Sequence, residues 1–185
     1  KHWLGATVFW QVDNKGNIRT GKIMLYNSAT GKRVKDNYKK YINWVHAVLS
    51  HDEFNLLQCL FGEHLLNQYP HSTVAIVESE KTAIIASAYL PGFIWLACGS
   101  LSQLSVQRLK VLKNRTVLLY PDLNGFEKWT AKATQLDGEI DGTKFIVSDL
   151  LEKNTDVIEK SHGFDIADYL IRFPLKEFNP PASEP

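Results

Sequence analysis

Acidic and amide side chains follow several apolar runs of the sequence, each near the point where the run ends. Glu78 ends "TVAIVE", Asp122 follows "TVLLYP" with Asn124 two residues on, and Asp165 and Asp168 lie in "GFDIADYL". Carboxylate and amide oxygens are the ligands that hard divalent cations such as Mg²⁺ prefer. Neighbouring carboxylates also repel each other unless a cation or a proton intervenes. The pattern therefore predicts metal-assisted chemistry if the runs share one edge of a sheet.

Each of these acids also has an ordinary structural explanation. Glu78 and Glu80 could complement the dipole at the start of a helix, and Asp122 could cap a helix N-terminus. The segment "DIADYL" is weak evidence by itself, because Asp is common at helix starts. Lys81 is either a surface lysine or a cation that holds a phosphate beside the carboxylates. Three acidic positions at strand ends of one sheet favour the functional explanation.

Residues 73–173 alternate apolar runs with segments typical of helices. Strands are expected where the runs are apolar on both faces, over residues 73–78, 93–99, 115–122 and 143–151. Helices are expected between and after them, over residues 80–90, 102–113, 125–136 and 165–173. This order predicts an α/β fold with a mostly parallel four-stranded sheet flanked by helices. Ligands of such sheets bind beyond the carboxyl ends of the strands, where the acids would meet.

The first part of the chain carries the signals of a β-hairpin. "TVFWQVD" alternates apolar and polar residues, "NKGN" is a turn, and "IRTGKIMLY" is a second strand. Basic residues lie in or after this hairpin, namely Arg19, Lys22, Lys32, Arg33 and Lys35. They form either a solvated sheet face or a surface for nucleic-acid phosphates.

The segment 54–69, "FNLLQCLFGEHLLNQY", has apolar residues at helical spacing and predicts an amphipathic helix. Three regions are therefore expected. A small β subdomain covers residues 1–53, an α/β domain led by this helix covers residues 54–173, and a loose tail covers residues 174–185.

The composition is that of an ordinary globular protein, with 185 residues and a formal net charge of +1. This balance excludes a strongly basic nucleic-acid binder but not a local basic patch. Cys59 and Cys98 lie in apolar surroundings, and no Cys/His cluster has metal spacing, so reduced core thiols and no zinc are expected. No apolar run reaches bilayer length and no signal peptide is visible, which predicts a cytoplasmic location without a membrane partner. The chain starts "KHWLGA" and is expected to be a fragment.

The order of motifs from about residue 7 to 173 resembles a Toprim domain, and more closely the catalytic core of bacterial and phage-type primases. "VAIVESEKTAI" resembles the first Toprim motif, "WLACGSLSQL" the strand-and-glycine segment after it, and "VLLYPDLNG" the DxD motif. "GFDIADYL" resembles a late acidic element of primases. "GKIMLYNSATGKR" and "QCLFGEHLL" resemble the basic N-terminal subdomain and the helix that precedes the Toprim fold.

The resemblance implies phosphoryl or nucleotidyl transfer on nucleic acid with Mg²⁺ or Mn²⁺, in the replication of a plasmid, phage or conjugative element. The partners that it implies are single-stranded DNA, nucleotides and a replicative helicase. The sequence is silent on oligomeric state.

The same resemblance gives roles to individual residues. Glu78 would ligate metal or assist proton transfer, with Lys81 as a catalytic cation beside it. Asp122 and Asn124 would bind Mg²⁺. The outer acidic ligands would be Asp165 and Asp168, and the contacts to template or nucleotide phosphates would come from Arg19, Lys22, Lys32, Arg33 and Lys35.

Four features depart from the family pattern, and one of them is Gly125, which lies nearer to the DxD-like motif than the glycine that usually follows it. Ser79 stands where a glycine is usual, Thr82 where an aspartate is usual, and Asn124 at the second aspartate of the DxD motif. Losing two acids lowers the negative charge that would hold two metal ions. Three functions stay open: a primase-like enzyme, a catalytically degenerate Toprim module that binds DNA or nucleotide, and a Toprim nuclease.

Overall fold

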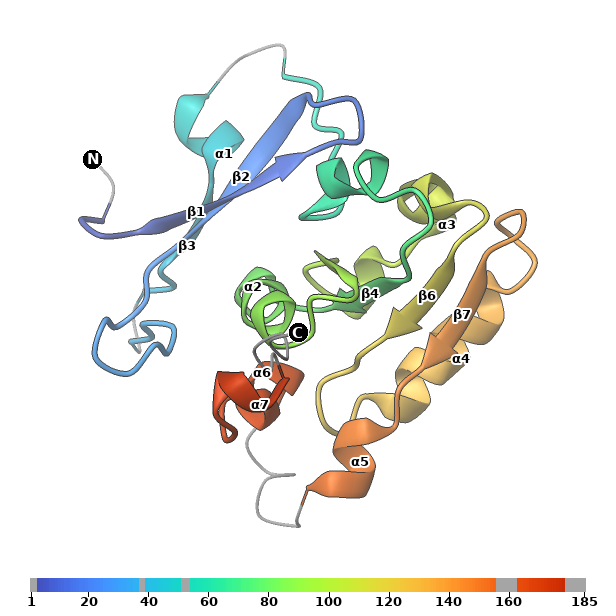
Figure 1. Ribbon diagram of the computed structural model, residues 1–185. Helices are drawn as coiled ribbons and strands as arrows, with labels where there is room; N and C mark the ends of the chain where they lie inside the picture. The colour runs from blue at the N-terminus through green and yellow to red at the C-terminus, as the bar shows by residue number, and fades with distance from the viewer. Residues whose placement is uncertain (1–2, 37–38, 51–53, 156–162, 179–185) are drawn as a thin grey trace, which may run out of the picture. The chain divides into compact units, whose positions relative to one another are not determined.

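The structure, a computed structural model, describes residues 3–36, 39–50, 54–155 and 163–178 (Figure 1). The chain forms two compact units, Lys1–His64 and Leu65–Pro185, and each is described by itself. Residues 54–64, which the sequence analysis assigned to the α/β domain, group with the first unit.

The first unit is built on a three-stranded antiparallel sheet of order β1-β2-β3. Its strands are β1 (Thr7–Val12), β2 (Ile18–Met24) and β3 (Ile42–Trp44), and the short helix α1 (Val45–Leu49) follows β3. The predicted hairpin is therefore present as β1 and β2. Gly21 allows a close approach on this sheet, because a Cβ there would lie 2.7 Å from Val8 Cγ1 and 2.9 Å from Val45 Cγ2.

The turn between β1 and β2 is organised by one buried carboxylate, that of Asp13. It accepts hydrogen bonds from the backbone N–H groups of Lys15 and Asn17 at 2.9 and 2.8 Å. Arg19 on β2 adds an ion pair at 2.6 Å to the same carboxylate. Burial alone would raise the pKa of Asp13, but these hydrogen bonds lower it to about 2. Asp13 thus fixes the turn and engages Arg19.

The amphipathic helix predicted over residues 54–69 is wrong in this extent. The described residues from Phe54 to Leu60 contain no helix, and a short 3₁₀ helix, η1, covers only Glu63–Asn67. The buried Glu63 carboxylate explains the difference, because it accepts the backbone N–H groups of Leu60 at 3.2 Å and of Asn14 at 3.1 Å. A tertiary hydrogen bond to Asn14 therefore competes with the helical path that the local pattern favours.

The second unit contains a four-stranded sheet of order β5-β4-β6-β7, and every neighbouring pair in it is parallel. The strands are β4 (Val74–Val77), β5 (Ile94–Ala97), β6 (Thr116–Leu119) and β7 (Lys144–Val147). β4 and β5 are entirely buried, as expected for strands covered on both faces. The predicted α/β class with a parallel sheet flanked by helices is confirmed.

Helices connect and cover these strands (Figure 1). They are α2 (Glu80–Tyr89), α3 (Val106–Leu109), α4 (Phe126–Leu136), α5 (Leu150–Asn154), α6 (Ile166–Leu170) and α7 (Leu175–Phe178). α2 packs on β5 and on α6, whereas α4 packs along β7. No helix in the described part of the chain is long and apolar enough to cross a membrane.

One helix prediction and the prediction of a loose tail need correction in this unit. The helix expected over residues 102–113 is split into η2 (Leu101–Gln103), α3 and η3 (Lys110–Leu112), because the fully buried Leu104 leaves helical backbone geometry at ψ 83°. The tail expected to be loose from residue 174 contains α7. Residues 179–185 lie outside the described part.

The edge of the sheet where the strands begin is fastened by Arg115. Its guanidinium donates to the backbone carbonyls of Leu66 at 2.7 Å, Tyr69 at 2.9 Å and Ser72 at 3.2 Å. These carbonyls belong to the segment that leads into β4, and Arg115 itself directly precedes β6. One side chain therefore ties the approaches to two adjacent strands together.

We expect Asp13→Ala to destabilise the first unit by about 2–4 kcal/mol, because it leaves buried N–H groups and Arg19 without their acceptor. Chemical denaturation at pH 7 measures this free energy. The matched control is Asp141→Ala, which removes an exposed surface carboxylate paired with Lys113 and should change the stability far less. Because the pKa of Asp13 is lowered, its contribution is present above pH 3.8 and is lost as the pH falls through about 2. Equal losses in the two variants would contradict this role.

Candidate active site

The sheet of the second unit has one topological switch point, between β4 and β6. The chain leaves β4 toward β5 on one side and then returns past β4 to form β6 on the other side. Connections therefore diverge at the carboxyl ends of β4 and β6, and ligands of open α/β sheets bind in the crevice that this creates. Glu78 directly follows β4, and Asp122 follows β6 after two residues. The two acids thus stand on adjacent strands at this point.

Glu78 and Asp122 line one cavity of about 490 Å³. Asn124 lines it as well, so three of the predicted metal ligands share one space. The other polar side chains in its wall are those of Ser100, Ser102 and Lys128. The cavity therefore combines acidic groups with two hydroxyls and one ammonium group.

The loop that carries Asp122 and Asn124 is a tight turn. Gly125 N–H donates to the Asp122 carbonyl at 2.8 Å, and Asn124 has a left-handed backbone with φ 69°. A Cβ at Gly125 would lie 2.7 Å from the Asp122 carbonyl oxygen, so only glycine fits without a shift. Leu123 N–H also donates to the Phe164 carbonyl at 2.8 Å, which connects this loop to the start of α6.

The cavity is rich in negative charge. Burial, and then the charges of Glu78, Asp165 and Asp168, together raise the pKa of Asp122 to about 7. On the other side of β4, burial followed by the charge of Glu78 raises the pKa of the Cys98 thiol to about 12. Glu78 is therefore close enough to influence groups on both neighbouring strands.

Asp165 and Asp168 also cap the N-terminus of α6. They form a capping box at the start of α6, in which Asp168 N–H donates to Asp165 at 3.0 Å and Asp165 N–H donates to Asp168 at 3.2 Å. The second oxygen of Asp165 accepts the hydroxyl of Thr82 at 2.5 Å. Hydrogen bonds thus engage both oxygens of Asp165.

The Thr82–Asp165 contact escaped the sequence analysis, although Thr82 itself was noted as a departure from the family pattern. The two residues are 83 positions apart and meet only because α2 packs against α6. Thr82 is buried, so its hydroxyl needs a partner, and Asp165 supplies it.

The two lysines of this region differ in position. The predicted catalytic Lys81 lies in the first turn of α2, and the described residues that line the cavity do not include it. Lys128, which the sequence analysis missed, lies in the first turn of α4 and lines the cavity. Its distance of six residues from Asp122, just inside the helix after the loop, was the signal that could have found it.

The predicted phosphate-binding cations all belong to the first unit. Arg19 is engaged by Asp13, whereas Lys32, Arg33 and Lys35 are exposed. Lys22 lies on β2 opposite Phe9 of β1 and Trp44 of β3. The nucleic-acid role of these residues stays a prediction.

The described oxygen groups of the cavity suit one hard cation that keeps part of its water shell, and they do not form a complete set of protein ligands. Among the described residues, no group of three or more His, Cys, Asp or Glu side chains could hold a metal ion. Glu78 and Asp122 nevertheless offer two carboxylates at one cavity, with the Asn124 amide beside them. Mg²⁺ is commonly bound through one or two carboxylates and keeps several waters, so these residues suit it.

Comparisons with known proteins give a family and a fold. Residues 1–123 match the model of a family described as a domain of unknown function, DUF6371. The crystal structure of the Aquifex aeolicus primase, with its zinc-binding and RNA polymerase domains, is similar at a TM-score of 0.59 and 13% identity, over 94% of this chain and 38% of that chain. The Escherichia coli primase catalytic core is similar at a TM-score of 0.47 and 13% identity, over 90% and 55%. No curated protein matches. The chain thus spans about two fifths to just over half of these primase structures.

We expect the stability of the metal-free protein to fall as the pH rises from about 4 to above 7, because Asp122 must then ionise in a buried, acidic place. Its pKa is raised in the folded state, so its contribution is fully present below 3.8 and lost as the pH passes about 7. Asp122→Asn should remove this slope and gain at most about 4 kcal/mol at pH 8. Thermal unfolding across this range measures the slope.

The control for this measurement is Asp149→Asn, because Asp149 follows β7 at the same edge of the sheet and pairs with Lys153 at 2.7 Å. It should keep the slope of the original protein. The explanation is wrong if Asp122→Asn also keeps that slope.

Proposed function

The chain belongs to the DUF6371 family, and from this premise and its acidic cavity we propose that it is a primase-like Toprim protein that transfers phosphoryl or nucleotidyl groups on nucleic acid with Mg²⁺. Its place would be the replication of a plasmid, phage or conjugative element. The observation that carries the proposal is the pair Glu78 and Asp122, which follow adjacent parallel strands and line one cavity at the switch point.

The likeness to the Aquifex aeolicus primase supports the proposal through the fold. The motif order of the sequence supports it independently, because the first Toprim motif ends at Glu78 and the DxD-like motif begins at Asp122. The exposed cations of the first unit, Lys32, Arg33 and Lys35, would bind the phosphates of single-stranded DNA or of nucleotides. A replicative helicase would be the protein partner.

The residues of the cavity have complementary tasks in this proposal. A bound divalent cation would neutralise phosphate charge and orient the reacting oxygens. Glu78 and Asp122 would hold it, and Glu78 would also accept a proton from the attacking hydroxyl. Lys128, which lines the same cavity, would bind a phosphate, and Lys81 would add positive charge at the start of α2. Ser100 and Ser102 would donate hydrogen bonds to the same phosphate.

A second candidate, a module that binds DNA or nucleotide without catalysis, is favoured by one specific observation. Both oxygens of Asp165 are taken by the capping box and by Thr82, and Asn124 supplies an amide in place of a carboxylate. Fewer carboxylate oxygens are then left for a second metal ion. The two candidates agree on the ligand class and differ on turnover.

Glu78→Gln and Asp122→Asn should each lower primer synthesis on single-stranded DNA by at least about 100-fold, because each removes half of the carboxylate pair. The assay uses the full chain with Mg²⁺ or Mn²⁺ and labelled nucleotides, and it also follows cleavage of the DNA. Asp149→Asn is the control and should retain full activity. Retained activity in both cavity variants would refute the site, whereas binding without turnover in the original protein would favour the second candidate.

Lys128→Ala should weaken nucleotide binding in the presence of Mg²⁺ by about 10-fold, because the cavity loses its one lining ammonium group among the described residues. Equilibrium dialysis with ATP and GTP measures this change. Lys144→Ala is the control, because Lys144 is exposed at the start of β7, on the opposite edge of the sheet. Lys81→Ala is tested in the primer-synthesis assay, and it should lower the activity if Lys81 is part of the catalytic set. Equal affinities for Lys128→Ala and Lys144→Ala would remove Lys128 from the site.

A further inference from the structure

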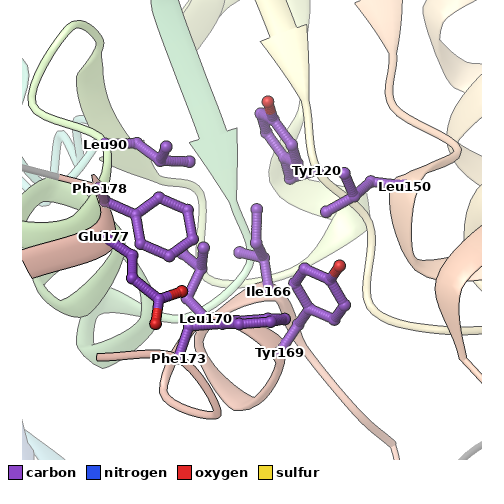
Figure 2. Close-up of a pocket in the computed structure, with 9 residues that line it drawn as sticks. All are labelled: Leu90, Tyr120, Leu150, Ile166, Tyr169, Leu170, Phe173, Glu177 and Phe178. Atoms are coloured by element: carbon purple, nitrogen blue, oxygen red, sulfur yellow. The ribbon is translucent and has the colours of Figure 1, made fainter. Parts of the chain in front are cut away.

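The second unit contains another cavity, of about 450 Å³, which the proposed transfer site does not use. Its wall is aromatic and aliphatic, and Figure 2 shows the rings of Tyr120, Tyr169, Phe173 and Phe178 around it. We call it the aromatic pocket. Leu90, Leu150, Ile166, Leu170 and Glu177 complete its lining.

Contacts behind the aromatic pocket hold two of its rings in place. Tyr89 of α2 packs edge-on against Phe178 at 5.3 Å between ring centroids, and its hydroxyl donates to the Phe173 carbonyl at 3.1 Å. Phe173 in turn contacts Phe178 at 6.1 Å and Tyr169 at 5.4 Å. The rings therefore form a pre-arranged apolar wall, which lowers the ordering cost of binding a flat ligand.

Three of the lining residues carry polar groups, namely the Glu177 carboxylate and the hydroxyls of Tyr120 and Tyr169; the Tyr120 hydroxyl points away from the other lining side chains (Figure 2). Within the described ranges, no hydrogen bond or ion pair engages the Glu177 carboxylate. A carboxylate accepts hydrogen bonds only, whereas a phenol both donates and accepts. The matching ligand is a flat ring that carries N–H donors on one edge and acceptors elsewhere.

The aromatic pocket is connected to the acidic cavity by shared chain segments. Tyr120 precedes Asp122 by two residues at the end of β6, and Tyr169 directly follows Asp168 on α6. The charge of Asp168 contributes to the raised pKa of Asp122, so the start of α6 is near the acidic cavity. A ligand of the pocket would thus be close to the proposed transfer site.

We propose that the aromatic pocket binds a nucleobase that carries an amino group, stacked on the ring of Tyr169, with the inclined ring of Phe173 beside it, and donating its N–H groups to Glu177. The choice of a nucleobase rests on the proposed function of the acidic cavity. Guanine offers two adjacent N–H donors to a carboxylate, cytosine offers an amino group, and uracil offers one ring N–H. Stacking accepts any base, so the carboxylate supplies the preference among them.

The test uses the full chain without metal, and its probes are guanosine, cytidine and uridine, which lack phosphate. Isothermal titration calorimetry should give the tightest binding for guanosine and the weakest for uridine. Glu177→Gln should weaken guanosine binding about 5- to 10-fold and reduce the preference over uridine. Tyr169→Leu should weaken all three nucleosides by about 5- to 100-fold, because a stacking surface is lost.

The control for Glu177→Gln is Glu139→Gln, which removes the same charge at an exposed position after α4 and should leave the affinities unchanged. Because Glu177 is exposed, its replacement tests the proposal even if Tyr169→Leu does not fold. The proposal is overturned if no nucleoside binds, if Glu177→Gln binds as tightly as Glu139→Gln, or if only a cationic probe such as arginine amide binds.

These outcomes are separate from those of the transfer assay. Nucleoside binding needs neither Mg²⁺ nor turnover, so an inactive protein with Glu177-dependent guanosine binding would refute the transfer function and retain the pocket. An active protein that does not bind guanosine would refute the nucleobase pocket and retain the transfer function.

Discussion

β4 is hydrogen-bonded to a strand on each side and covered on both faces, and this double burial determines where the acidic groups of the second unit lie. All four of its residues are buried, so a charged side chain can stand only beyond its last residue. Glu78 occupies that position. Because β6 runs parallel beside β4, the loop after β6 reaches the same edge and brings Asp122 to the same cavity. The carboxylate pair therefore follows directly from the order of the strands.

Placing acids together at a half-buried edge costs free energy, and hydrogen bonds offset this cost for some of the acids but not for all. The carboxylates of Asp165 and Asp168 accept hydrogen bonds from backbone N–H groups at the start of α6, and Asp165 also accepts one from the Thr82 hydroxyl. For Asp122, burial and then the neighbouring charges raise the pKa, and none of the hydrogen bonds of the described residues opposes them. A cation or a proton at Asp122 would remove the repulsion, which is why this carboxylate is the most informative one to alter.

The sequence predicted the parts of the structure that depend on local patterns. Buried parallel strands are short apolar runs, so their ends, and with them Glu78 and Asp122, were predictable. Lys128 and the Thr82–Asp165 contact were not, because they depend on how α4 and α2 pack against distant elements. The helix predicted over residues 54–69 failed for a related reason, since the Glu63 carboxylate binds the backbone of the distant Asn14. The aromatic pocket likewise combines α2, β6 and the C-terminal helices, which no local pattern joins.

The two edges of the parallel sheet respond differently to proton concentration. The edge where the strands end holds carboxylates whose charge depends on pH, with Asp122 changing near neutrality. The edge where the strands begin is tied by Arg115, whose guanidinium keeps its charge at any pH a cell reaches, even though burial lowers its pKa. A change of pH within that range therefore alters the charge at the cavity end and leaves the charge of Arg115 at the opposite end unchanged. The charge of one end of the sheet is therefore constant, whereas that of the other end depends on pH.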